Sequence, residues 1–579
     1  MGAFHLIRPG ALADPAATRA RLGEAFRRQG FGAPHVLSGG PGWEIAAYGG
    51  LVSGPALHAE TAAGQRAAGA GTLFYRGAAG TEALARLADD AAAGGIDHAA
   101  LHGSFAVALA GPAGLQVLTD RIGTFPLYAD AGQAILSTSF LALAEALPRL
   151  TPNPAGVYDY LLQEAPHGGE TLFEEIRQVA GDRVLTVGTG GIAAHDRPPL
   201  VPAAPAAAPV DAYAEACLAP LRTQARDYAA AFGARIDTAL SGGFDSRLIL
   251  ALLREQGVVP RLHVYGRAGD PDVRVAQAIA AGEGLDLEHT DKAQAPVVPP
   301  EAFPEVVAAN LLAFDGCPGD GLFNNGADLA TRRARCAAGE LMLNGGGGEI
   351  FRNFFYLPDR PLPARRLVWA FYGRFDPAAL GPRFDERAYV AGLADRIARA
   401  VGGDPARLTR QQVELAYPLF RCRYWMGRNN GVNNRLGSAV TPFCTEAAVL
   451  AAAAVPLAAK NAGRLEARMI ARADPALARY ASAYGFPFDR PPPAGYRLKD
   501  ALTRVRPPWL RRYTYRLKHR RPPALPRYLT PAYVDRVLPG GFDPVRPYAD
   551  PARAGDAGLY NRLCSLEYLL RHLGGTVRG

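Results

Sequence analysis

The sequence predicts a mixed α/β protein in which antiparallel strands come first and a parallel sheet with helical crossovers follows. Short alternating apolar runs separated by glycines, such as "SFAVALAG" and "QAILSTS", dominate the N-terminal third. A proline- and alanine-rich run comes next. After it, strand-like runs alternate with longer helical patterns, as in "ARIDTAL", "DSRLILALLREQG" and "RLHVYG". This alternation is βαβ patterning and indicates a parallel sheet with right-handed crossovers.

The length of 579 residues predicts two or three domains. Residues 1–197 carry the antiparallel pattern and form the first predicted domain. The run "PPLVPAAPAAAPVDAY", residues 198–213, is typical of a semi-rigid linker. Residues 214–462 carry the βαβ pattern. Residues 463–579, rich in arginine, proline and tyrosine, are expected to form a helical, basic C-terminal extension.

Composition excludes several classes of protein. With 49% hydrophobic and 20% charged residues, the chain is not of the disordered class. The six cysteines show no metal or disulfide spacing, which favours a reducing compartment. The start of the chain lacks a signal-peptide pattern, and no apolar stretch is long enough to span a bilayer. We therefore expect a cytoplasmic protein, with membrane association left open.

A basic segment at residues 497–521 contains ten Lys/Arg against one Asp, interleaved with aromatic residues. It could face an acidic partner or an anionic membrane surface. An ordinary solvated surface with aromatic anchors is the favoured interpretation, because Pro507 and Pro508 interrupt any continuous amphipathic helix. No specific nucleic-acid partner is expected, and a homodimer stays open.

The stretch "TALSGGFDSRLILALL", Thr238 to Leu253, places two glycines between a strand pattern and a helix pattern. Gly242 and Gly243 let the backbone turn sharply and let an anion approach without a Cβ in the way. The N–H groups at the start of the following helix would face the same anion. A carboxylate beside a phosphate cradle needs a bridging cation, so Asp245 is predicted to bind magnesium.

Two further segments are expected at the same edge of the sheet. The strand ending at Val264 to Gly266 would lie near an adenine. Four consecutive glycines, Gly345–Gly348, suggest a second approach to phosphate, with Glu349 completing the metal site. The predicted ATP-binding residues are Leu240, Ser241, Gly242, Gly243, Asp245, Ser246, Val264, Tyr265, Gly266, Gly345, Gly346 and Gly347. The predicted magnesium ligands are Asp245 and Glu349.

The string SGGxDS resembles the PP-loop of ATP pyrophosphatases, which cleave ATP between the α and β phosphates while adenylating a substrate. It is not a Walker A loop. Together with "DRIGTFPLYAD", "GGGGEIF" and "SAVTPFCTEAAVLAAAAVP", it resembles the asparagine synthetase family. That resemblance implies an N-terminal glutaminase-like domain of the Ntn-type α+β sandwich, followed by a PP-loop synthetase domain with ATP and Mg²⁺.

The departures from the family pattern carry information of their own. Glutamine-hydrolysing members expose an N-terminal cysteine, whereas this chain begins Met1, Gly2, Ala3 and has no cysteine before Cys217. Glutaminase activity is therefore not expected. The family's acidic pair becomes Gly348 and Glu349, and its glutamate before "ARVPF" falls at Ser438. The cationic catalytic residues are predicted to be Lys460 and Arg464, which lie near where the family places its lysine.

The resemblance implies an ATP-dependent carboxylate–amine ligase that adenylates a small-molecule or peptide carboxylate. Aspartate with ammonia is one substrate pair. Macrolactam closure, as in lasso-peptide cyclases, and amidation in surface-polysaccharide or antibiotic pathways are alternatives. A non-catalytic nucleotide-binding scaffold is the alternative of another class, because the N-terminal cysteine, one glutamate and part of the metal loop are lost.

Overall fold

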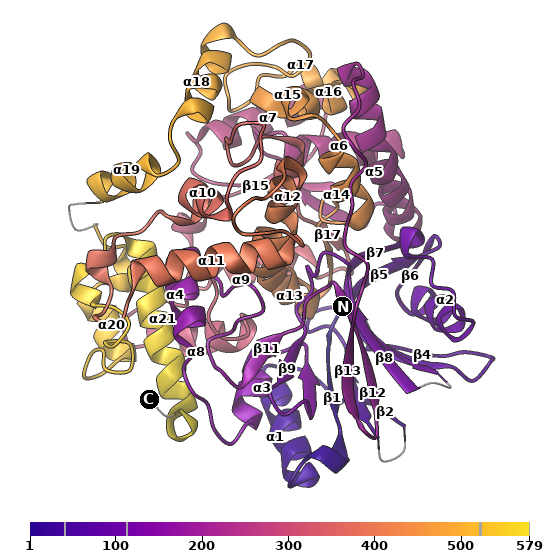
Figure 1. The fold of residues 1–579 in the computed structure, drawn as a ribbon, viewed down its shortest axis with the longest axis vertical. Coiled ribbons are helices and arrows are strands. Elements are labelled where there is room, and N and C mark those ends of the chain that lie inside the picture. The colour runs from indigo at the N-terminus through magenta and orange to yellow at the C-terminus, as the bar shows by residue number, and fades with distance from the viewer. Residues whose placement is uncertain (40–41, 112–113, 520–523, 578–579) are drawn as a thin grey trace.

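The computed structural model describes residues 1–39, 42–111, 114–519 and 524–577. Within these ranges the chain forms two antiparallel sheets, one parallel sheet and many helices (Figure 1). The mixed α/β class is thus confirmed, with antiparallel strands first and a parallel sheet after them. The long helix α5 (Val210–Phe232) leads from the first part into the second.

The two antiparallel sheets face each other. The first has the order β11-β9-β10-β1-β3-β2 and the second the order β13-β12-β8-β7-β5-β4, with β6 paired to β5. Alanines and larger apolar side chains from β1, β3, β5 and β7 fill the space between the sheets. The strands are β1 (Ala3–Ile7), β2 (His35–Ser38), β3 (Glu44–Tyr48), β4 (Leu57–Glu60), β5 (Arg66–Tyr75), β6 (Ala78–Ala79), β7 (Leu101–Gly111), β8 (Gly114–Thr119), β9 (Tyr128–Asp130), β10 (Ile135–Ser137), β11 (Ile176–Gln178), β12 (Arg183–Gly188) and β13 (Gly191–Asp196).

Helices cover the outer faces of these sheets. Helix α1 (Pro15–Arg28) packs Ala25 and Phe26 against β1 and β3, and α2 (Gly80–Ala92) packs Leu84 and Leu87 against the second sheet. This gives four layers, helix on sheet on sheet on helix. Two more helices of this part are α3 (Phe140–Ala146) and α4 (Pro154–Gln163).

The parallel sheet has the order β16-β15-β14-β17-β18. Its strands are β14 (Ile236–Ala239), β15 (Arg261–Tyr265), β16 (Leu287–Thr290), β17 (Leu341–Leu343) and β18 (Ser438–Val440). Thr238 pairs with Leu262 on one side and with Leu343 on the other, so β14 is the central strand. The loops that follow β14, β15 and β17 therefore meet at one edge, where ligands of open α/β sheets bind.

The remaining helices surround this sheet. They are α6 (Asp245–Glu255), α7 (Pro271–Glu283), α8 (Phe303–Ala313), α9 (Ala327–Arg335), α10 (Ala364–Leu367), α11 (Glu386–Ala400), α12 (Arg410–Ala416), α13 (Gly427–Leu436), α14 (Glu446–Ala453), α15 (Leu457–Lys460), α16 (Arg464–Ala473), α17 (Pro475–Arg479), α18 (Ala494–Val505), α19 (Leu510–Lys518), α20 (Pro531–Val537) and α21 (Ala557–Leu573). A π-helix, η7 (Tyr417–Met426), continues α12 into α13.

The proline-rich run has no regular structure over residues 198–209, and its last four residues already belong to α5. The C-terminal region is helical, as expected, but it is integrated into the rest of the chain. Helix α16 packs on α5 and α6, and α21 packs on α4. Residues from this region therefore reach the edge of the parallel sheet.

Candidate functional site

The predicted phosphate loop joins the carboxyl end of β14 to the first turn of α6. Ser246 Oγ accepts a hydrogen bond from the backbone N–H of Ser241 at 2.9 Å and lies 3.0 Å from Ser241 Oγ. The backbone N–H of Gly242 donates to a carboxylate oxygen of Asp272 at 2.9 Å. Asp272 belongs to the first turn of α7. The loop thus already binds an anionic group through its backbone, in the form of this side chain.

A segment from the C-terminal region, residues 481–488, covers the loop. The backbone N–H of Ala483 donates to Gly242 O at 2.9 Å. The ring of Phe244 stacks on Phe488 at 4.1 Å and lies 5.0 Å from the ring of Tyr484. A Cβ on Gly242 would lie 2.6 Å from the Ala483 Cβ. The absence of a side chain at Gly242 therefore makes room for Ala483, in addition to any room that it makes for a ligand.

Arg247 fixes the covering segment to α6. Its side chain is fully buried, and it donates to the carbonyl oxygens of Tyr480 at 2.9 Å and Ala481 at 3.0 Å. Its guanidinium also lies over the ring of Phe488, 4.6 Å from the centroid. The loop, α6 and segment 481–488 are consequently one packed unit.

The run of four glycines follows β17, next to the first loop. A Cβ on Gly346 would lie 2.6 Å from the Met426 Cε, and Gly347 has a φ of +93°. A Cβ on Gly348 would lie 2.0 Å from Asp245 Oδ1. Three of the four glycines thus have a packing or conformational reason to be glycine. As the loops are arranged, an acidic side chain at position 348 does not fit beside Asp245.

Arg352 occupies the centre of the site. Its Nη2 donates to both carboxylate oxygens of Asp245, each at 3.0 Å, and lies 3.5 Å from Glu349 Oε1. Its Nε lies 3.2 Å from Glu466 Oε2. Glu349 also accepts a hydrogen bond from the hydroxyl of Tyr417 at 2.6 Å. Three carboxylates from three different segments therefore converge on one guanidinium.

The charges of this cluster do not balance, since one cation faces three carboxylates. Burial by itself lowers the pKa of Arg352, but the carboxylates of Asp245, Glu466 and Glu349 raise it well above its ordinary value. Burial, and then the neighbouring Asp245, raise the pKa of the fully buried Glu466 well above its ordinary value. Glu466 therefore holds a proton more readily than a glutamate in water does.

The predicted magnesium ligands are not arranged as a metal site. Among the described residues, no group of three or more His, Cys, Asp or Glu side chains is placed to hold a metal ion. A metal ion between Asp245 and Glu349 would have to take the place of the Arg352 guanidinium, which contacts both carboxylates. As arranged, these residues do not fit a metal held by the protein.

Neither of the two predicted catalytic cations forms an ion pair with Asp245 among the described residues, where Asp245 pairs with Arg352. Lys460 is buried and pairs with Glu414 at 2.6 Å. The next residue along, Asn461, accepts a hydrogen bond from Asn353 at 3.1 Å. Arg464 is exposed at the start of α16 and has no ion pair in the part of the chain that the structure describes. The cation at the loops is Arg352.

The end of β15, which the sequence predicts to lie near an adenine, is next to the end of β14 in the sheet. Gly266 follows β15, and its carbonyl oxygen lies 2.8 Å from His289 Nε2. Tyr265 carries the ammonium of Lys292 over its ring, 4.2 Å from the centroid. Val264 is buried within the sheet. The backbone of this strand end is therefore beside the first loop, with Tyr265 as its partly exposed aromatic side chain.

Position 2 holds Gly2, and the sequence therefore predicts no nucleophile there. Its backbone N–H donates to Asn434 O at 2.7 Å, and its φ is +82°. A Cβ there would lie 2.0 Å from the Tyr48 carbonyl oxygen. A cysteine side chain at position 2 does not fit this backbone. The chain's six cysteines are all buried.

Four residues of the site were not found from the sequence: Asp272, Arg352, Glu466 and Tyr484. Arg352 follows Glu349 by three residues in "GGGGEIFRNFF", and that one-turn spacing was the available signal. The other three lie on α7, on α16 and in the covering segment, far from both glycine loops in sequence. Only the packing of the chain brings them there.

No family model matches the chain, and no curated protein matches it. Within the described ranges, each helix is too short or too polar to cross a bilayer.

Proposed function

We propose that this protein is an ATP-dependent, AMP-forming carboxylate–amine ligase without glutaminase activity. The observation that carries the proposal is the meeting of two glycine loops at the carboxyl ends of β14 and β17, with Asp245 and Arg352 paired between them. Backbone N–H groups at a helix start and a guanidinium are the donors that phosphate prefers. The arrangement of the two loops, Asp245 and Arg352 is explained without a metal ion bound by protein carboxylates.

In the proposed reaction, an oxygen of the substrate carboxylate attacks the α-phosphorus of ATP. The bond from that phosphorus to the bridging oxygen of the β-phosphate breaks, and pyrophosphate leaves. An amine then attacks the acyl carbon, AMP leaves, and the amine loses its proton to solvent. The chain's own groups position the phosphates and neutralise charge: Arg352 shifts part of its interaction from Asp245 to the phosphate oxygens.

Access to the loop requires a movement of the covering segment, residues 481–488. Tyr484 and Ala483 lie against Phe244 and Gly242, so a nucleotide bound at the loop displaces them. Asp272 likewise gives up its hydrogen bond from Gly242 when a phosphate oxygen replaces it. The arrangement is thus a closed form, and nucleotide binding is expected to select an open one.

The chemical identity of the product separates this proposal from its alternatives. An AMP-forming ligase converts ATP to AMP, whereas a kinase or an ATPase forms ADP, and a scaffold forms neither. Chromatography of the nucleotides after incubation with candidate carboxylates and amines tests this. Aspartate with ammonia, a peptide with a free amine and side-chain carboxylate, and a sugar acid are the substrate classes to compare. Steady release of glutamate from glutamine contradicts the absence of glutaminase activity.

We further propose that α18 and α19 bind an anionic membrane surface. Of the thirteen exposed large hydrophobic side chains in the described ranges, six lie between residues 498 and 517. They are Leu498, Leu502, Val505, Trp509, Tyr513 and Leu517. The helices separate at Pro507 and Pro508, as predicted, yet the spacing of three or four residues continues across the break.

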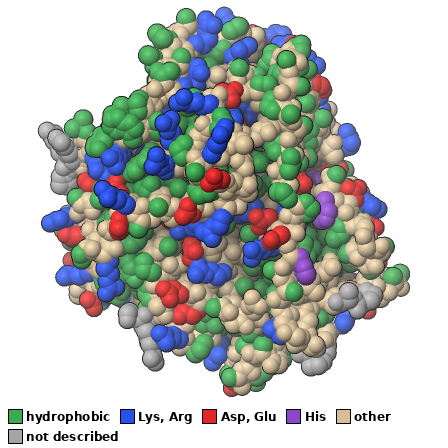
Figure 2. Space-filling view, in the orientation of Figure 1, with side chains coloured by type: hydrophobic (Ala, Val, Ile, Leu, Met, Phe, Trp, Pro, Cys, Tyr) green, Lys and Arg blue, Asp and Glu red, His purple; other side chains and the backbone are tan. Residues whose placement is uncertain are grey.

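The side chains of this surface are of the kinds that contact an anionic bilayer. Hydrophobic and Lys/Arg side chains gather over α18 and α19 at the upper left margin of the molecule (Figure 2). Arg497, Lys499 and Lys518 are exposed on the same two helices. Apolar side chains with aromatic and basic neighbours are the composition of helices that lie in the plane of a membrane interface. The last two residues of the predicted basic segment, 520 and 521, lie outside the described residues.

A further inference from the structure

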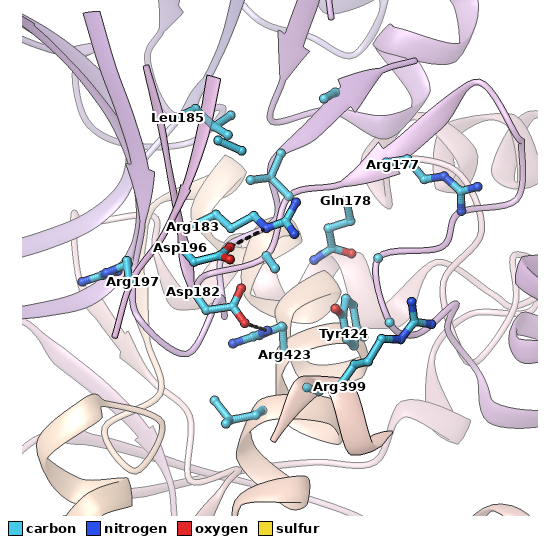
Figure 3. A pocket seen from close by; sticks show the side chains of 18 of the residues that line it. Arg177, Gln178, Asp182, Arg183, Leu185, Asp196, Arg197, Arg399, Arg423 and Tyr424 are labelled. Atoms are coloured by element: carbon cyan, nitrogen blue, oxygen red, sulfur yellow. Dashed lines mark ion pairs between the residues drawn. The ribbon is translucent and has the colours of Figure 1, made fainter. Parts of the chain in front are cut away.

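A second cavity lies away from the glycine loops, between the strands of the first part and the helices of the second. Its volume is about 650 Å³, within the range of small-molecule sites. Figure 3 shows how side chains from above, Arg183 and Gln178, and from below, Arg399, Arg423 and Tyr424, surround one space. The nucleotide proposal assigns nothing to it.

The cavity has a surplus of positive charge. Seven arginines and three aspartates line it. Two of the arginines pair with carboxylates outside the lining: Arg396 with Asp159 at 2.9 Å, and Arg177 with Glu170. Two of the aspartates pair with arginines of the same cavity: Asp196 with Arg183 at 3.2 Å, and Asp182 with Arg423 at 3.7 Å (Figure 3). The third, Asp130, accepts hydrogen bonds from the backbone N–H groups of the strand that follows it. Arg197 and Arg399 have no carboxylate partner in the described part of the chain.

Two of the arginines are buried with only distant carboxylate partners. The side chain of Arg423 is 2% exposed, its Nε donates to Ile122 O at 2.7 Å, and its one carboxylate partner among the described residues is Asp182, 3.7 Å away. Arg121 is 8% exposed, its nearest carboxylate oxygen is 3.8 Å away on Glu446, and its Nη1 finds no hydrogen-bond acceptor in the described ranges. A buried cation in this state costs free energy that a bound anion would recover.

The arginines also disfavour one another. Burial lowers the pKa of Arg121; the carboxylates of Glu446 and Asp182 oppose this in part, and the neighbouring Arg423 adds a smaller lowering. Burial and then Arg121 lower the pKa of Arg197 to about 10. Like charges held together in a partly dry cavity are a site for a multiply charged anion.

The shape of the lining indicates what carries the anion. Leu185, Leu200 and Leu419 also line the cavity and give it apolar surface, and Tyr424 adds an aromatic ring. Guanidinium groups bind phosphate oxygens in pairs, and the volume exceeds that of an inorganic ion. We propose that this cavity binds a small organic phosphate, with one or two phosphate groups against the arginines and an apolar or planar body against the leucines.

The cavity and the glycine loops lie on two sides of one helix. Leu419, Arg423 and Tyr424 of η7 line the cavity, whereas Tyr417, half a turn away, donates to Glu349 at the loops. A π-helix often marks a functional position in a chain. The two sites are nevertheless separate in their residues, so each can be tested without the other.

Calorimetric titration of the full-length protein tests the proposal. Geranyl diphosphate and ADP are the organic probes, and inorganic pyrophosphate is the head group alone. We expect at least one organic diphosphate to bind tenfold or more tightly than pyrophosphate. Absence of saturable binding by both organic probes, or equal binding of pyrophosphate, overturns the proposal. Preference for ADP or for geranyl diphosphate identifies a nucleoside or an aliphatic body.

Variants place the binding in the cavity. Arg399→Gln removes an exposed charge from the cavity, and Arg399 has no ion pair among the described residues. The control, Arg387→Gln, removes an exposed charge that lies on the same helix but outside the cavity. We expect the first to weaken binding threefold or more and the second to leave it unchanged. Arg121→Met should weaken binding tenfold without lowering the melting temperature, because it removes a charge that burial disfavours. Binding that is equal in Arg399→Gln, Arg121→Met and the unaltered protein overturns the assignment.

One further control separates this site from the glycine loops. Arg352→Gln changes the loops only and should leave binding of geranyl diphosphate unchanged. If Arg352→Gln abolishes it while Arg121→Met and Arg399→Gln do not, the anion binds at the loops and the cavity proposal is wrong. Failure of the ligase proposal, by contrast, leaves the binding in the cavity unaffected.

Discussion

Arg352 donates from a single nitrogen to both carboxylate oxygens of Asp245, at the point where a divalent cation was expected. Asp245 starts α6 and Arg352 follows the second glycine loop, so the pair joins the two loops through a charge contact. A guanidinium stands here where a metal ion would stand in a carboxylate cluster: it places one positive charge among Asp245, Glu349 and Glu466. The proposed chemistry is built around this cation.

Glu466 gives a pH dependence with a defined sign. Its folded-state pKa is raised well above the ordinary value of 4.5, first by burial and then by Asp245. Above pH 4.5 the folded state therefore holds a proton that the unfolded state releases, and stability falls as pH rises through this window. Relative to Glu466→Gln, the unaltered protein should lose stability between pH 5 and pH 8. Urea unfolding at each pH measures the difference, and parallel curves for the two proteins contradict it.

Gly348 should not tolerate a side chain. Because a Cβ there lies 2.0 Å from Asp245 Oδ1, Gly348→Ala forces the Asp245–Arg352 pair apart and should cost about 2 kcal/mol in the free energy of unfolding. Gly392→Ala on α11 is the matched control, since a Cβ there meets no atom within 4 Å. It should be neutral or stabilise the protein by roughly 0.5 kcal/mol through helix propensity. Equal effects of the two substitutions contradict the packing account.

Tyr484 holds the covering segment closed over the loop. Tyr484→Ala removes a ring contact to Phe244 worth about 1 kcal/mol, which shifts the equilibrium toward the open form. The dissociation constant for ATP, measured by calorimetry, should fall by roughly threefold. Tyr513→Ala on α19 removes an exposed ring far from the loop and should leave the constant unchanged. Weaker ATP binding in Tyr484→Ala would mean that the ring contacts the nucleotide instead of excluding it.

The α18–α19 surface should bind vesicles that contain anionic lipid. Sedimentation with phosphatidylcholine vesicles, with and without phosphatidylserine, measures this. Leu502→Glu places a charge in the apolar stripe and should reduce binding about tenfold, whereas Val259→Glu, at a side chain exposed to a similar extent elsewhere, should not. If Leu502→Glu changes the oligomeric state and not the vesicle binding, the surface is an interface between two copies of this chain.

Local signals predicted much of the fold and part of the site. The order of antiparallel strands, proline-rich run and parallel sheet follows from periodicity and from turn residues, and the strand–loop–helix at Ser241 to Ser246 follows from adjacent residues. The helix break at Pro507 and Pro508 follows from the missing N–H and fixed φ of proline. These features depend on neighbours in sequence, which the sequence displays directly.

The rest depends on contacts between distant residues. Arg352 and Glu466 lie near Asp245 only because α16 packs on α6, and no local sequence pattern indicates that contact. The covering of Gly242 by Ala483 has the same origin. Lys460 fits the pattern of a catalytic cation, yet its charge is already neutralised by Glu414. The seven-arginine cavity likewise combines residues between 121 and 423, which are scattered along the chain.

Carboxylate-dependent release of pyrophosphate from ATP tests the central claim most directly. The account predicts that one of the three substrate classes stimulates release of pyrophosphate with an equal amount of AMP. Asp245→Asn and Arg352→Gln should each abolish that stimulation, while the surface variant Arg387→Gln retains it. Release of pyrophosphate that is equal in Asp245→Asn and the unaltered protein, or ATP binding with no turnover for any substrate class, would contradict the account.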